Sequence, residues 1–81
     1  MLHIIDAKHI TEHTLWLKFD DGTAGNVDLS HALTGKIFEP LTDPNAFAKV
    51  SVDKELETIT WPNGADFAPE FLKALYIKQH I

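Results

Sequence analysis

Histidine has the widest chemical range of the side chains in this sequence, and five histidines occur in 81 residues. His9 and His13 have the i, i+4 spacing that two zinc ligands adopt on one face of a helix. The residues around them predict a strand end and a turn, so the two rings should not share a helical face. His3 and His9 lie on one strand face, but six residues of extended chain separate them by about 20 Å. We therefore predict solvent-exposed histidines and no metal site.

Nucleophilic catalysis has few candidate residues here. The chain has no cysteine, and Ser30 and Ser51 are its two serines. Ser30 directly precedes His31, and neighbouring side chains on a helix do not face each other, whereas a general base must come within about 3 Å of its nucleophile. Most aspartates fall in predicted turns and helix starts, and the four glycines lack the spacing of a phosphate-binding loop. We predict no catalytic residue, no cofactor and no enzyme activity.

The segment of residues 61–66 (Trp-Pro-Asn-Gly-Ala-Asp) joins a predicted strand to a predicted helix. Backbone N–H groups at such a junction can bind an anion, and tryptophan is a frequent anchor of protein interfaces. In a purely structural interpretation, the tryptophan fills the core and the other residues form the turn and the helix start. The candidates for a partner-binding or ligand-binding site here are Trp61, Asn63, Gly64 and Asp66.

Two strands and a hairpin turn are predicted in the first third of the chain. Residues 3–10 form the first expected strand, and Thr14–Phe19 alternates apolar and polar side chains as a half-buried strand does. Asp21-Gly22 is a strong signal for a two-residue hairpin loop. Folding the chain back at that loop pairs Trp16 with Val27.

The rest of the chain predicts a second hairpin and a terminal helix. Short helical turns are expected at 28–33 and 43–47, strands at 50–52 and 58–61, and a helix that begins at Asp66. The predicted fold is a single α+β domain over residues 1–81, with a mainly antiparallel sheet of four to five strands, built from two hairpins, and the C-terminal helix packed on one face. The expected core residues are Leu17, Phe19, Ile59, Trp61, Phe71 and Leu75.

The charge of the chain argues against several classes of partner. Twelve acidic residues face seven lysines and no arginine, which gives a net charge of −5. Such a surface repels phosphate backbones, so we expect no direct binding of nucleic acid, whereas a basic protein would suit it. No apolar run reaches the roughly 18–20 residues that cross a bilayer, and no signal peptide is recognisable. We therefore expect no membrane association and a cytoplasmic protein.

The predicted terminal helix has apolar residues on more than one side. Ile77 lies four residues after Lys73 and three before His80, which places it on the polar side, and Ile81 continues that line. An aligned exposed pair is a candidate contact patch, through which the chain would form a homodimer or meet another protein. A frayed, solvated last turn is the competing interpretation.

An ordered set of short motifs resembles the bacterial family known as domain of unknown function 2442. The matching segments cover nearly the whole chain: Leu15–Gly22, Val27–Leu29, Phe38–Leu41, Val50–Asp53, Thr58–Asp66 and Pro69–Leu72. The resemblance implies a small sheet with a C-terminal helix and brings no catalytic residues. It also implies that some relatives belong to toxin–antitoxin-like pairs and that others carry an additional DNA-binding segment.

Three functions remain open from the sequence. The first is a non-enzymatic protein-interaction domain, for example the acidic, antitoxin-like member of a two-protein pair. The second is a module that senses a small ligand through residues 61–66, and the third is a small enzyme.

Overall fold

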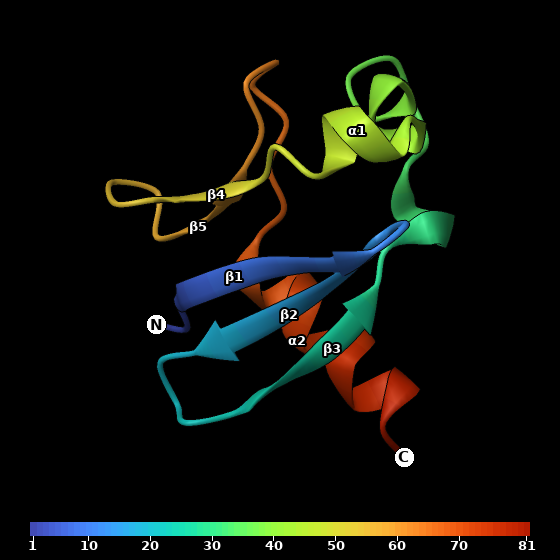
Figure 1. The fold of residues 1–81 in the computed structure, drawn as a ribbon. Coiled ribbons are helices and arrows are strands. Elements are labelled where there is room, and N and C mark those ends of the chain that lie inside the picture. The colour runs from blue at the N-terminus through green and yellow to red at the C-terminus, as the bar shows by residue number, and fades with distance from the viewer.

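The computed structural model describes residues 1–81 and shows a small α+β fold (Figure 1). Two 3₁₀ turns, Ser30–Ala32 and Glu39–Thr42, lie in the connection after the third strand. The strands and α-helices are β1 (Ile4–Thr11), β2 (Thr14–Phe19), β3 (Ala24–Asp28), α1 (Pro44–Phe47), β4 (Ser51–Asp53), β5 (Thr58–Thr60) and α2 (Pro69–Gln79). None of the helices has the length and apolar character needed to span a bilayer.

The strands form two separate antiparallel sheets, whereas the sequence predicted a single sheet of four to five strands. One sheet has the order β1-β2-β3, and the other is the β4–β5 hairpin, which lies beside β1 (Figure 1). The Ile4 N–H donates a hydrogen bond to the Glu57 carbonyl at 2.9 Å, so the two sheets meet at the start of β1. Both predicted hairpins are confirmed. The second is too short, at three residues a strand, to extend the first sheet as a full ladder.

The hairpin between β2 and β3 has a three-residue loop, and the predicted register is wrong by one position. Gly22 is the last loop residue and has φ +91°, the conformation that completes a turn with a bulge. The additional loop residue places Val27 opposite Leu15 and not opposite Trp16. Because side chains alternate along a strand, this shift moves Val27 onto the core face, where it is buried.

Helix α2 begins later than predicted. Asp66 does not cap it, since its backbone forms an isolated bridge with Thr60 and so extends the second hairpin. The N-cap position is Ala68, and Pro69 opens the helix, where its missing N–H costs little. Phe67 therefore belongs to the connection that precedes the helix, where it is buried.

The core lies between the larger sheet, the second hairpin and α2, and one predicted core residue is outside it. Phe71 is 43% exposed. Helix α2 is oriented with Leu72 toward the core, so the adjacent Phe71 lies at the side of the helix. The other five predicted residues lie in the core or pack against it: Leu17, Phe19, Ile59, Trp61 and Leu75.

Candidate functional site

The turn that follows β5 is closed by its own hydrogen bonds. The Trp61 N–H donates to the Ala65 carbonyl at 3.0 Å, and the Gly64 N–H donates to the Trp61 carbonyl at 2.9 Å. The Asn63 side chain donates to the Ile37 carbonyl at 2.8 Å and accepts from the Ala65 N–H at 3.0 Å. Gly64 has φ +89°, a conformation that favours glycine. The polar groups of Asn63 are thus used within the protein.

The two ends of that turn also have structural contacts. Trp61 is 4% exposed, and its Nε1–H donates to the Phe47 carbonyl at 2.8 Å. Asp66 is exposed, but its backbone pairs with Thr60 and the helix starts three residues later. The backbone at Asp66 is therefore not a helix N-terminus that could hold an anion. These contacts favour the structural interpretation of the turn.

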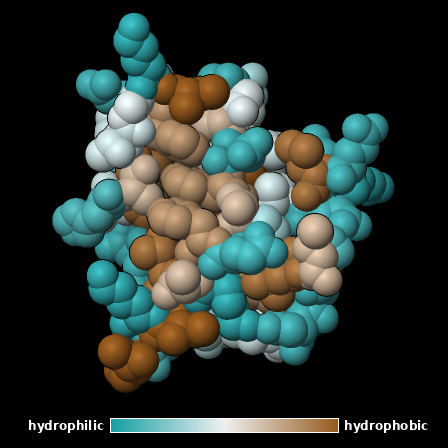
Figure 2. Space-filling view, turned by 180° about the vertical axis from the view of Figure 1, so that it is seen from behind, coloured by the Kyte–Doolittle hydropathy of each residue, from teal (hydrophilic) through white to brown (hydrophobic).

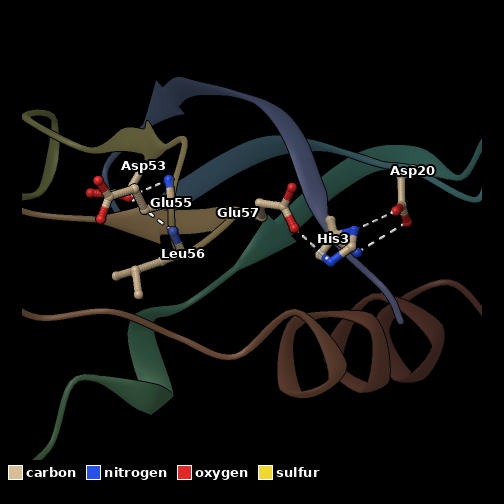
Figure 3. A network of polar contacts seen from close by, with 6 residues as sticks. All are labelled: His3, Asp20, Asp53, Glu55, Leu56 and Glu57. Carbon is tan, nitrogen blue, oxygen red and sulfur yellow. Dashed lines mark hydrogen bonds and ion pairs between the residues drawn. The ribbon is translucent and has the colours of Figure 1, made fainter.

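A cluster of ionisable side chains lies where the two sheets meet (Figure 3). His3 Nδ1 is 2.8 Å from an Asp20 oxygen, and His3 Nε2 is 2.7 Å from a Glu57 oxygen. Each contact is a hydrogen bond when the nitrogen carries a hydrogen. The Asp20 pKa lies below its usual value, first because its carboxylate accepts the His3 backbone N–H. Both ring nitrogens of His3 are engaged, so the side chain links Asp20, which follows β2, to Glu57, which precedes β5. No ring nitrogen is left to contact a substrate.

The other histidines near β1 are less exposed than predicted. His9 and His13 are half-buried, and both rings contact Phe47 edge-on, with centroids 5.9 Å and 5.3 Å away. His13 Nε2 lies 2.8 Å from the Thr42 carbonyl oxygen. The two rings thus cover one side of Phe47. No group of three or more potential metal ligands occurs in the structure.

The outer face of α2 is the most distinctive surface of the fold. Leu72 points into the core and Tyr76 is half-buried, whereas Phe71, Ala74 and Ile77 are exposed. Figure 2, which views the molecule from behind, shows an apolar band across this face and further apolar side chains near the C-terminal end. Ile77 is 53% exposed, although Lys73 and His80, which defined the predicted polar side, contact the larger sheet. An apolar surface that the fold itself leaves uncovered is a candidate binding site.

Phe71 is the exposed end of a row of three stacked rings that leads from the helix into the core. Phe71 stacks on Phe67 with centroids 5.3 Å apart, and Phe67 stacks on Phe38 with centroids 4.5 Å apart. Ile37, next to Phe38, is also exposed. Phe71 and Ala74 were not among the residues predicted for a contact patch. The available signal was that apolar residues lie on more than one side of the helix, which a single buried face does not need.

An open groove runs beside this face. Its volume is about 660 Å³, and the lining residues are Asp28, His31, Ala32, Phe71, Leu75, Lys78 and Gln79. The three apolar residues form part of the wall, and the others are polar or charged. Phe71 and Lys78 of α2 line this groove, so the groove adjoins the exposed face of the helix.

Several contacts hold the inner side of α2 to the sheet. Lys73 Nζ forms an ion pair with Asp21 in the β2–β3 loop. The Tyr76 ring lies over Gly25, where a Cβ atom would be 2.6 Å from the ring. The Asp28 N–H donates to Gln79 Oε1 at 2.8 Å, and Gln79 Nε2 donates to the Asp28 carbonyl at 2.9 Å. The helix is thereby fixed with its apolar outer face toward solvent.

The sequence of this chain matches a known protein family. The family model described as a protein of unknown function, DUF2442, matches residues 4–78. The chain belongs to this family, as the motifs predicted. None of the curated proteins matches it.

A solved structure shares the fold. It is the crystal structure of "Putative DNA Binding Protein NE0471" from Nitrosomonas europaea, which superposes with a TM-score of 0.85 at 20% sequence identity. The match covers 99% of this chain and 52% of that chain. This chain therefore spans about half the length of that neighbour, and the likeness confirms the fold.

Proposed function

We propose that this chain is a non-enzymatic protein-interaction module that binds a partner through the outer face of α2. The observation that carries the proposal is the alignment of exposed apolar residues on a helix that is already anchored on its other side. Phe71, Ala74 and Ile77 share this outer face, and Ile81 follows the end of the helix. Exposed apolar area of this kind is stabilised when a second protein removes it from water.

The acidity of the chain supports the finer form of this proposal. With a net charge of −5, the module suits a basic protein partner, as in an antitoxin-like member of a two-protein pair. DNA binding is named for a neighbour about twice as long, and the missing arginines argue against assigning it to this chain.

A second candidate function is the binding of a small ligand in the groove beside Phe71. Its volume of about 660 Å³ lies within the usual range of small-molecule sites. Asp28, His31 and Lys78 would supply the polar contacts. The protein-interaction proposal ranks first because exposed apolar residues extend beyond this groove, over Ala74 and Ile77.

Photo-crosslinking in the native cell tests the interaction proposal. A photoreactive amino acid at Ala74 should give protein adducts, since this position is at the centre of the outer face. The same amino acid at Lys54, which is exposed in the β4–β5 loop, is the matched control. Adducts at position 74 and not at position 54, identified by mass spectrometry, support the proposal. The absence of adducts at position 74 contradicts it.

A further inference from the structure

We infer that the partner for the outer face of α2 is a second copy of this chain, bound with the two helices antiparallel and a two-fold axis at Ala74. This inference rests on the proposed interaction function and names the occupant of the same surface, a second copy of the chain in place of a basic protein. A two-fold interface requires one surface to be complementary to itself. The outer face of α2 meets that condition in both charge and shape.

The charges are arranged symmetrically about Ala74. Glu70 lies four residues before Ala74 and Lys78 lies four residues after it, and all three are exposed. In an antiparallel pair centred on Ala74, residues equally distant from the centre meet, so each Glu70 faces Lys78 of the other copy. A parallel pair would instead place Glu70 beside Glu70 and Lys78 beside Lys78. The charges therefore favour the antiparallel arrangement.

The apolar residues follow the same symmetry. Phe71 lies three residues before Ala74 and Ile77 three residues after it, so a large aromatic side chain meets a large aliphatic one at two equivalent places. Ala74 meets itself on the axis, and a small residue there lets the two helices approach closely. Ridge-and-groove packing of helices needs this alternation of large and small side chains.

The size of the contact indicates a weak dimer. Helix α2 has 11 residues, which corresponds to a length of about 16 Å. Two such helices bury less than the roughly 1,600 Å² of a standard interface. Each copy also carries a net charge of −5, which opposes association at long range. We expect a dissociation constant on the order of 0.1 mM in about 0.15 M salt, where the Debye length is about 8 Å.

Charge reversal tests the geometry. Sedimentation of the full chain at up to about 1 mM should show a monomer–dimer equilibrium. Glu70→Lys and Lys78→Glu should each weaken self-association by about tenfold, because each creates two like-charge pairs across the axis. An equimolar mixture of the two variants should associate again, since every pair across the axis then joins opposite charges. A monomeric wild type, or a mixture that associates no better than the separate variants, overturns the inference.

A cysteine on the axis gives an independent test that does not depend on the charge variants. The natural chain has no cysteine. Chains with Ala74→Cys should form disulfide-linked dimers under mild oxidation, because the two-fold axis brings the two positions together. Chains with Lys54→Cys should remain monomeric. Equal cross-linking of both variants overturns the inference.

The two proposals can fail separately. A purified chain that stays monomeric, together with cellular adducts of a different protein at position 74, overturns the homodimer and leaves the interaction function in place. A monomeric chain with no adduct at position 74 overturns both.

Discussion

Asp21 has two structural roles through one carboxylate. It accepts the Thr23 N–H at 2.9 Å inside the β2–β3 loop, and it pairs with Lys73 on α2. The hydrogen bond from Lys73, followed by that from Thr23, lowers the pKa of Asp21 to about 2. Because the folded pKa lies below the usual value, the ionised carboxylate stabilises the folded state. Its contribution is complete above the unfolded pKa and is lost as the pH falls toward 2.

The Asp21→Asn variant should therefore lose less stability on acidification than the natural chain does. Denaturant titrations between about pH 5 and pH 2 measure the free energy of unfolding, and its slope against pH reports the carboxylates that titrate. Part of the slope should remain, since Asp20 and Asp28 also have lowered pKa values. Asp66→Asn, at an exposed aspartate without an ion pair, is the matched control. Identical slopes for Asp21→Asn and the natural chain would contradict the prediction.

Helix α2 has apolar residues on its buried inner side and, among charged residues, on its exposed outer side. Leu72 is completely buried, whereas the adjacent Phe71 is 43% exposed and stacks on Phe67. Deleting a side chain costs stability in proportion to the apolar contacts and the cavity that it leaves. The inner face therefore determines folding, and the outer face is available for binding.

Truncation of the two neighbouring residues should separate these tasks. Leu72→Ala should lower the free energy of unfolding by about 2–5 kcal/mol, as for a fully buried leucine. Phe71→Ala should cost less than about 2 kcal/mol, since much of the ring is already in water. Thermal and denaturant unfolding of both variants measures the difference. An equal loss of stability in the two variants would show that the assignment of the faces is wrong.

Local patterns predicted most of the elements but not how they meet. The hairpins and the terminal helix follow from side-chain alternation and turn residues, which act within a few positions. Asp21-Gly22 fits both a two-residue and a three-residue loop, so the register depended on packing that the dipeptide does not encode. Asp66 has the residue type of a helix cap, and its bridge to Thr60 is a tertiary contact. Phe71 was assigned to the core because apolar spacing alone does not tell which face of a two-sided helix is buried.

The net charge and the exposed apolar residues of the whole molecule predict a protein partner and not a nucleic acid. With seven lysines against twelve acidic residues and no arginine, the surface repels phosphate backbones overall, so counterion release contributes little. The exposed apolar residues of α2 supply a different source of binding free energy. The neighbour that is named for DNA binding has a chain about twice as long.

This chain alone should not bind duplex DNA in about 0.15 M salt. Fluorescence anisotropy of a labelled duplex, titrated with the protein up to about 100 µM, measures this directly; non-specific binders reach half-saturation at or below about that concentration. A known basic DNA-binding domain, run in parallel, establishes that the labelled duplex is competent. Saturable binding by this chain that weakens steeply with added salt would contradict the prediction.

Each free edge of the larger sheet is covered in part, by different means. The β4–β5 hairpin lies beside β1. At β3, the Gln79 side-chain amide pairs with the main chain of Asp28 as a strand would, and His80 Nε2 lies 2.7 Å from the Asn26 carbonyl oxygen. Uncovered edge strands are templates for edge-to-edge aggregation. The last turn of α2 therefore occupies part of the β3 edge, and a partner that binds the folded helix also favours, by mass action, the state in which that edge is closed.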